Sequence, residues 1–336
     1  MRIQKNQNSS MVAIRSFPQL WTDRLQPFTM LFFLFLNLQT ASAQWAYIPN
    51  FSDNNVSVID LDSLRVIAKI PVGKAPFGVW CVPEKRKVYV ANAFSDNISV
   101  IDALTNTVEA TIQAGDGPAI PCYQNEKIYV ANTNDHTVSI IHAITGETEH
   151  VISVGKRPAS IHLTPDGRKC YVANTVSDDV SVINLSTKRV ERTIPVGDEP
   201  NFITANPKTN HLYVANLTSN DVSIINTINN TVEATIPVHL GPIVISVSPD
   251  GQNIYVSNCF ADTVNVINAH TYKMVATIKV GENPTGICIT PDGTKIGVAN
   301  QWDGNFMVID AQTYAIIATI PLGGRPTAAG SFFMPK

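Results

Sequence analysis

The chain has 336 residues, with 24 Lys and Arg against 27 Asp and Glu, and a formal net charge of −3. This length fits one large or two ordinary globular domains, and the slight acidic balance argues against a protein that binds polyanions. Charged residues make up only 15% of the chain, against roughly 25% in a typical soluble domain. Many strand positions are therefore expected to be buried on both faces.

An apolar run near the amino terminus has the form of a secretory signal. Residues 28–38 are almost wholly apolar, follow two arginines, and lead into the small residues Ala41-Ser42-Ala43. This order predicts a signal peptide over residues 1–43, cleaved before Gln44. The alternative is a transmembrane anchor, which needs about 20 apolar residues, roughly twice the length of this run.

Removal of the predicted leader makes the chain more acidic and sets its location. The mature protein keeps 20 of the 24 basic and 26 of the 27 acidic residues, a charge of about −6. No later segment is long and apolar enough to cross a bilayer as a helix. We expect a periplasmic, secreted or cell-surface protein without a membrane span after cleavage.

A four-residue motif recurs along the rest of the chain. It is Tyr-Val-Ala-Asn or a close variant, and its seven copies start at Tyr47, Tyr89, Tyr129, Tyr171, Tyr213, Tyr255 and Gly297. Successive copies are 42 residues apart, except for one interval of 40. A fixed period of about this length is typical of β-propeller blades.

Each repeat contains four apolar runs rich in Val, Ile, Thr and Tyr. A polar turn follows the tetrad, a second run comes next, and a third run ends in Gly, as in residues 193–197. A fourth run opens after a Pro three residues beyond that Gly, and Pro-Asp-Gly turns such as residues 165–167 join it to the next tetrad. Such turns suit tight hairpins. The pattern predicts four antiparallel strands per repeat.

The strand pattern and the chain ends favour a closed ring over a linear solenoid. Strands such as residues 180–183 carry small Ser where an exposed strand usually has a charge, so both sheet faces should be buried between like neighbours. The mature chain starts at Trp45 without a preceding strand, and residues 327–334 form a strand with no repeat to follow. We therefore predict an all-β, seven-bladed propeller over residues 44–336, in which the C-terminal strand joins the N-terminal blade as its innermost strand.

The repeated Tyr-Val-Ala-Asn, Val-Ser-Val-Ile-Asp and Thr-Ile-Pro-Val-Gly segments resemble the YVTN-family β-propeller repeat throughout the predicted mature chain. This resemblance implies a protein that is exported by a bacterium or displayed on an archaeal surface, and it leaves the ligand open. The chain departs from the pattern at Pro49, at Gly297 in place of Tyr, at His239 in place of the loop Gly, and in a third repeat that is two residues short. Because Pro49 has no amide donor, a bulge or an unpaired edge is expected there.

The repeated Tyr and Asn residues are expected to be structural, because ligands rarely need seven equal copies. We expect the Tyr rings to pack between blades and the Asn side chains to hold the backbone of the following turn.

Two groups of side chains are candidate ligand-binding residues. The loops between Gly and Pro should gather at one mouth of the channel, and they carry charged or titratable side chains that include Lys74, Arg157, His239 and Arg325. These charges either pair between neighbouring loops or form a funnel for a polar ligand. Four residues after the loop Pro, the innermost strands carry Trp80, His162, Thr204, Ser246 and Cys288. This ring either lines a water-filled channel or binds a small ligand through Trp80 and His162.

The sequence contains no recognisable catalytic, cofactor or metal motif. The seven His residues lie at different points of their repeats, which opposes convergence on a metal or a haem. The GxSxG, HExxH, P-loop and GxGxxG motifs are absent. The five Cys residues fit no metal spacing; Cys81 and Cys122 lie near the same point of successive repeats and form either a disulfide or buried thiols. No catalytic residue, metal ligand or cofactor is predicted.

Three functions remain open. The first is a non-catalytic binding or interaction scaffold of the cell envelope, whose partner is a protein, a glycan or a small molecule. The second is an enzyme or redox-accessory subunit, by analogy of fold with propellers that hydrolyse lactones or work with quinones or haem. The third is nucleic-acid binding, which the acidic mature chain disfavours. A regular ring without a catalytic cluster favours the first.

Overall fold

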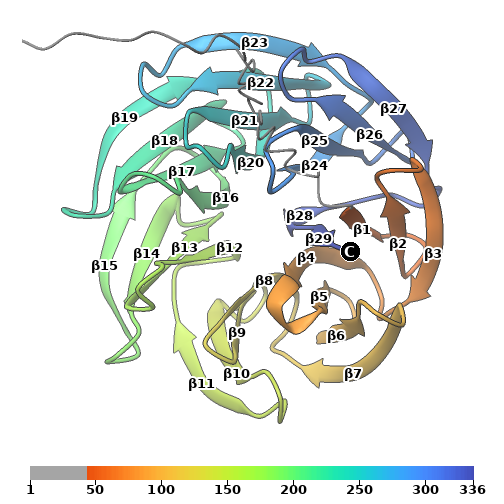
Figure 1. The fold of residues 1–336 in the computed structure, drawn as a ribbon. Coiled ribbons are helices and arrows are strands. Elements are labelled where there is room, and N and C mark those ends of the chain that lie inside the picture. The colour runs from red at the N-terminus through yellow and green to blue at the C-terminus, as the bar shows by residue number, and fades with distance from the viewer. Residues whose placement is uncertain (1–43) are drawn as a thin grey trace, which may run out of the picture. The chain divides into compact units, whose positions relative to one another are not determined.

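The computed structural model describes residues 44–336, which form a ring of radially arranged β-sheets (Figure 1). Seven sheets of four or more strands make up the ring, so the predicted all-β, seven-bladed propeller is confirmed. The predicted signal peptide, residues 1–43, lies outside the described residues. None of the helical segments within residues 44–336 is long and apolar enough to cross a membrane.

The blades are numbered in chain order, and their strands are given from the channel outward. Blade 1 has β29 (Phe333–Pro335), β1 (Gln44–Asn50), β2 (Asn55–Asp60) and β3 (Arg65–Pro71). Blade 2 has β28 (Ala329–Ser331), β4 (Pro76–Val82), β5 (Lys87–Asn92), β6 (Asn97–Asp102) and β7 (Thr107–Gln113), with a 3-10 turn, η1 (Pro83–Lys85), after β4. Blade 3 has β8 (Pro118–Gln124), β9 (Lys127–Asn132), β10 (Thr137–His142) and β11 (Thr148–Ser153).

The other four blades repeat the same order. Blade 4 has β12 (Pro158–Leu163), β13 (Lys169–Asn174), β14 (Asp179–Asn184) and β15 (Arg189–Pro195). Blade 5 has β16 (Pro200–Ala205), β17 (His211–Asn216), β18 (Asp221–Asn226) and β19 (Thr231–Pro237). Blade 6 has β20 (Pro242–Val247), β21 (Asn253–Asn258), β22 (Thr263–Asn268) and β23 (Met274–Lys279). Blade 7 has β24 (Pro284–Ile289), β25 (Lys295–Asn300), β26 (Asn305–Asp310) and β27 (Ile316–Pro321).

The two faces of the ring differ in their connections. On the face that we call the loop face, Gly-to-Pro loops lead from the outermost strand of one blade to the innermost strand of the next, as from β3 to β4. On the hairpin face, tight hairpins join the innermost strand of each blade to its second strand, as from β12 to β13. The innermost strand of each blade runs from the loop face to the hairpin face, with one edge towards the channel.

The C-terminal segment closes the ring as predicted. β29 pairs antiparallel with β1, with Trp45 opposite Met334 and Ala46 opposite Phe333. The strand predicted over residues 327–334 does not lie wholly in blade 1: its first part, β28, pairs in parallel with β4 of blade 2 and lies on the channel side of that blade (Figure 1). Gly330 within it has a φ of 117°, and a Cβ there would clash with the backbone carbonyl of Val79. Glycine is therefore required at the point where the segment crosses from blade 1 to blade 2.

Pro49 lies where the pairing of β1 with the C-terminal segment is irregular, although its carbonyl is not unpaired. The regular pairing of β1 with β29 ends at Ala46, the Tyr47 amide still donates to the Phe332 carbonyl, and pairing resumes where the Thr327 amide donates to the Pro49 carbonyl at 2.8 Å beside a bridge from Asn50 to Pro326. Between these points the C-terminal segment turns away to form β28. The missing Pro49 amide therefore costs no strand hydrogen bond, and the pairing of Pro49 with Val56 on its other side is unbroken.

The core consists of apolar layers between neighbouring blades, and the Tyr rings lie in these layers. The Tyr47 hydroxyl donates to Asn106 Oδ1 of blade 2 at 2.8 Å, and the Tyr171 hydroxyl donates to Asn230 Oδ1 of blade 5 at 2.6 Å. Both rings are fully buried. The prediction that these Tyr rings pack between blades is confirmed.

The prediction for the repeated Asn residues holds for Asn258, whose Nδ2 donates to the Thr263 backbone carbonyl at 3.3 Å just after the turn, but not for a residue such as Asn92. Asn92 Nδ2 donates to Asn97 Oδ1 at 2.8 Å and to Ser99 Oγ at 2.9 Å, and both acceptors are side chains of the next strand rather than backbone atoms of the turn. The reason is the register: Asn92 is paired directly with Asn97, so its amide faces the side chains of β6. The same residue also packs under Gly73, where a Cβ would lie 2.7 Å from it. The same contact with a tetrad Asn explains the Gly at this position in five loops, Gly73, Gly115, Gly155, Gly197 and Gly281.

Gly297 replaces the tetrad Tyr because two aromatic rings occupy the Tyr position. A Cβ at Gly297 would clash with the ring of Phe306 and lie 2.8 Å from the ring of Phe333. Phe306 lies on β26, at a position where the corresponding strands of the other blades have Val or Ile, and Phe333 belongs to the closing strand. The missing side chain at Gly297 thus makes room for the large ring of Phe306 where blade 7 meets the closing strand.

All five cysteines are free thiols, so the Cys81–Cys122 disulfide is not formed. Cys288 is half-buried and the other four are buried. The alternative of buried thiols therefore holds.

Candidate functional site

The channel contains a cavity of about 290 Å³ near the hairpin face. Its lining includes Pro207, Pro249 and Pro291, which belong to the hairpins of three successive blades. The wall is largely aliphatic and aromatic, formed by Ile120, Ile161, Phe202, Ile203, Ile245, Val247, Ile287 and Ile289. A mostly apolar cavity with a few polar groups is the usual form of a small-molecule site.

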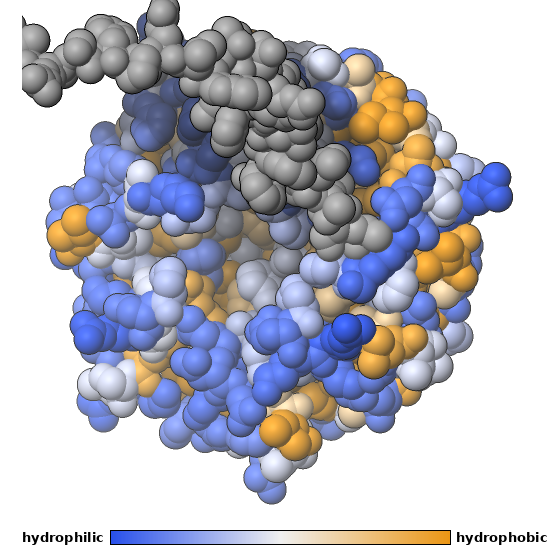
Figure 2. Space-filling model, in the orientation of Figure 1, coloured by the Kyte–Doolittle hydropathy of each residue, from blue (hydrophilic) through white to orange (hydrophobic). Residues whose placement is uncertain are grey.

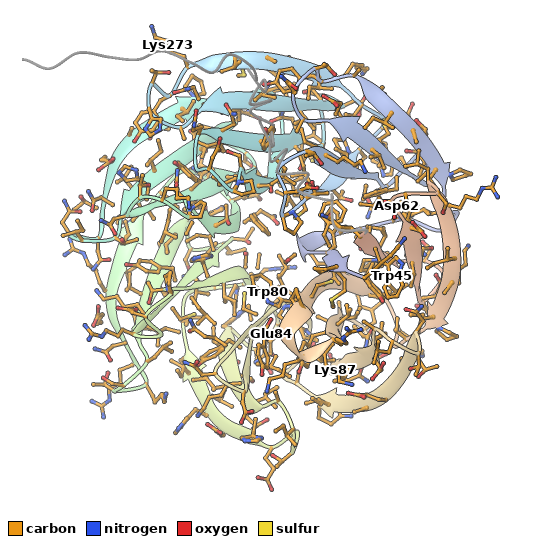
Figure 3. The ribbon with its side chains drawn as sticks, viewed as in Figure 1. Trp45, Asp62, Trp80, Glu84, Lys87 and Lys273 are labelled. Carbon is orange, nitrogen blue, oxygen red and sulfur yellow. The ribbon has the colours of Figure 1, made fainter. Side chains whose placement is uncertain are left out.

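The repeat brings five of the sequence-predicted side chains into this one cavity. They are Trp80, His162, Thr204, Ser246 and Cys288. The first four lie opposite the tetrad Tyr of their own blade, as Trp80 does with Tyr89, and Cys288 lies opposite Gly297. This shared register gives them a common height in the channel. Figure 3 shows Trp80 at the inner end of blade 2, beside the centre of the ring.

Three of these side chains have unused hydrogen-bonding capacity. Within residues 44–336, the Trp80 indole N–H, the His162 imidazole and the Thr204 hydroxyl have no hydrogen-bond partner. By contrast, Ser246 Oγ accepts the amide of Ile289 at 3.1 Å and so links blades 6 and 7. These groups are therefore free to form hydrogen bonds to a ligand that enters the cavity.

The cavity is electrically neutral. None of its lining residues is Asp, Glu, Lys or Arg. Burial lowers the pKa of His162 to about 4, so its imidazole is uncharged at neutral pH and offers one donor and one acceptor. Burial raises the pKa of the Cys288 thiol to about 11, so that group also stays neutral. A cavity of this kind suits an uncharged ligand group.

The loop-face candidates lie away from this cavity. Lys74, Arg157, His239 and Arg325 are exposed on the loop face and do not line the cavity. Within residues 44–336 none of them forms an ion pair, so the expected pairing between neighbouring loops does not involve them. His239 has a local role: its backbone amide donates to Asn265 Oδ1 at 3.0 Å, in the blade where Asn replaces the usual Ser.

The sequence reasoning missed a set of exposed aromatic side chains on the loop face. Phe94, Phe260 and Trp302 each lie two residues after a tetrad Asn, and 72%, 63% and 63% of their surfaces are exposed. The common offset was a signal that could have found them. In the view of Figure 2, apolar residues form separate patches among hydrophilic ones. The enclosed cavity is therefore the best-defined candidate site.

The fold and the cavity define a β-propeller with a ligand-sized space in its channel. The YNCE-like β-propeller family model matches residues 114–208 and 194–291, which together span 178 of the 336 residues. The chain therefore belongs to the YNCE-like β-propeller family, in agreement with its resemblance to the YVTN repeat. No match was found among proteins with curated functions.

Two solved structures illustrate the likeness of fold. A functionally unknown protein from Desulfotomaculum acetoxidans DSM 771 aligns with a TM-score of 0.76 and 16% identity, over 87% of this chain and 99% of the other. Hydrazine synthase from Kuenenia stuttgartiensis aligns with a TM-score of 0.71 and 20% identity, over 79% of this chain and 92% of the other. At these identities the likeness shows the fold alone.

Proposed function

We propose that this protein is an exported, non-catalytic binding propeller of the cell envelope that holds the uncharged part of a small ligand in its channel cavity. The observation that carries this proposal is the neutral cavity in which Trp80, His162 and Thr204 present unused donors and acceptors. The apolar wall would supply affinity through the burial of ligand surface, and the three polar groups would set the ligand's orientation.

The chemistry of the cavity supports binding more than catalysis. A nucleophilic thiol needs a lowered pKa, whereas burial raises the pKa of Cys288 to about 11. The pKa of His162 is lowered by burial, and no carboxylate lines the cavity to orient its ring as a general base. Within residues 44–336, no three His, Cys, Asp or Glu side chains gather as a metal site.

Export is tested by the mass of the protein recovered from the cell envelope of a bacterial host. We expect a chain that begins at Gln44, because Ala41-Ser42-Ala43 is the predicted cleavage signal. The variant Ala43→Arg should accumulate with residues 1–43 still attached. Recovery of the unprocessed wild-type chain in the cytoplasm would overturn this part of the proposal.

Ligand binding is tested with N-phenyl-1-naphthylamine, an uncharged fluorescent aromatic amine, titrated into the purified protein. We expect saturable binding that is weakened at least tenfold by Thr204→Phe and by His162→Phe, which fill the cavity from two different blades. Thr235→Phe is the matched control, because Thr235 is exposed on the outer strand β19. Unchanged melting temperatures establish that the variants are folded. No saturable binding, or equal binding by all variants, would refute the cavity as the site.

A further inference from the structure

A second and larger cavity lies between blades 4 and 5 at the hairpin face. It has a volume of about 850 Å³ and is lined by the hairpin after β12, the hairpin after β16, and the turn that contains Ile228. It shares His162, Ala205 and Pro207 with the channel cavity, so the two spaces adjoin. We call it the blade 4–5 groove. It leads from the channel outward to Ile228, which is 75% exposed.

The hairpins of blades 4 and 5 that border the groove are not tied together, in contrast to those of blades 3 and 4 and of blades 5 and 6. Gln124 Nε2 of blade 3 donates to the Thr164 carbonyl of blade 4 at 3.1 Å, and Asn206 Nδ2 of blade 5 donates to the Gly251 carbonyl of blade 6 at 2.9 Å. Within the described part of the chain, no such hydrogen bond or ion pair joins the hairpins of blades 4 and 5. Their separation leaves the channel cavity open at that side.

The groove carries cationic groups that lack firm carboxylate partners. The Arg168 side chain is 83% exposed, and its closest carboxylate oxygen is Asp166 Oδ2 at 3.7 Å. Lys208 is exposed and forms no ion pair within residues 44–336. In contrast, Lys169 is paired with Glu191 at 2.9 Å. Arg168 and Lys208 are therefore available to an anion that enters the groove.

In the corresponding cleft between blades 2 and 3, side chains of the two blades contact each other. Lys85 bridges it to Glu126 at 3.2 Å, and the rings of Tyr89 and Tyr123 stack with centroids 5.7 Å apart. Its volume is about 450 Å³, and none of its lining residues belongs to the channel cavity. Of these two clefts, the blade 4–5 groove is the larger, adjoins the channel cavity, and carries cations with at most a long carboxylate contact.

We propose that the ligand is an amphiphilic organic anion whose uncharged apolar body lies in the channel cavity and whose anionic group lies in the blade 4–5 groove near Arg168 and Lys208. This inference rests on the proposed function, because it extends the same cavity. The two spaces would hold different parts of the ligand: the channel has no charged lining residue, whereas the groove is lined by Lys208, which forms no ion pair within residues 44–336, and by Arg168, whose contact with Asp166 is long. The junction at His162 supplies a neutral hydrogen-bonding group between them.

The test uses two fluorescent probes that differ only in charge. 8-Anilinonaphthalene-1-sulfonate carries a sulfonate on the ring system of N-phenyl-1-naphthylamine. Because each exposed cation contributes modestly, we expect the double variant Arg168→Gln, Lys208→Gln to raise the Kd of the anionic probe about fivefold to tenfold. The Kd of the uncharged probe should not change. Added salt should weaken the anionic probe on the wild type and have little effect on the double variant.

The matched control removes the same two charge types from another hairpin on the same face. Lys85→Gln with Arg86→Gln acts on the hairpin of blade 2, where both residues are exposed. It should leave both probes unaffected. An equal loss in this control and in the groove variant would show a general surface-charge effect and overturn the inference.

The failures of the two proposals are distinguishable. If the uncharged probe binds and Thr204→Phe abolishes that binding, but the groove variant leaves the anionic probe unchanged, the groove inference is wrong and the channel site stands. If neither probe binds saturably to the wild type, the channel site fails and the groove inference fails with it.

Discussion

The closing strand makes a quantitative prediction about stability. Phe332, in the C-terminal segment next to β29, is fully buried, and its ring lies 5.8 Å from that of Phe306 and 4.7 Å from that of Phe333, measured between centroids. Truncation of a fully buried Phe to Ala costs about 3–5 kcal/mol, from lost apolar burial and the cavity left behind. We expect Phe332→Ala to lower the free energy of unfolding by this amount. The Phe332 carbonyl would still accept the Tyr47 amide, so the measurement isolates the ring.

The assay is urea-induced unfolding followed by far-ultraviolet circular dichroism. Phe94→Ala is the matched control, because it removes the same atoms from a side chain that is 72% exposed. This control should cost less than about 1 kcal/mol, which covers the lost edge-to-face contact with Phe51. If Phe332→Ala cost no more than Phe94→Ala, the C-terminal segment would not hold the ring closed, and the packing argument would be refuted.

Three other perturbations test the fold and its electrostatics. Gly297→Tyr should be destabilising by several kcal/mol because the Phe306 ring fills that space, and Phe306→Val should recover part of the loss in urea unfolding, whereas purely additive losses would contradict the compensation. The Lys87 ammonium lowers the pKa of Asp102 to about 2, so the stabilisation by this carboxylate is complete above pH about 4 and is lost as the pH falls towards 2. The difference in free energy of unfolding between wild type and Asp102→Asn should therefore vanish over that pH window in acid unfolding, and a constant difference would contradict it. All five thiols should stay unreactive towards 5,5′-dithiobis(2-nitrobenzoic acid) at pH 8 until the protein unfolds, because burial raises the pKa of thiols such as Cys288; rapid labelling of the folded protein would contradict this.

Periodicity predicted the ring well because the same physical problem recurs in every repeat. Seven tetrads 42 or 40 residues apart, each with two apolar faces, predicted the number of blades, and the incomplete repeats at the two ends predicted how the ring closes. The features that were predicted wrongly depend on local details that the repeat period does not determine. The repeated Asn amides bond to side chains such as Ser99 because strand register fixes their direction. The strand predicted over residues 327–334 is divided, and the pairing of its first part, β28, with blade 2 was missed because nothing in the repeat pattern marks the crossing at Gly330.

The candidate site was only partly predictable because it depends on where the blades differ. One repeat position placed Trp80 and His162 in the channel, but the volume beside them depends on residues from five other segments. The blade 4–5 groove was not predictable at all, since it lies between two hairpins whose sequences look ordinary. A side chain such as Gln124, which ties blade 3 to blade 4, has no counterpart that ties blade 4 to blade 5. In a ring of near-identical blades, the repeat positions that carry the same residue in every blade hold the blades together. The capacity to select a ligand must therefore come from positions at which the residue differs between blades.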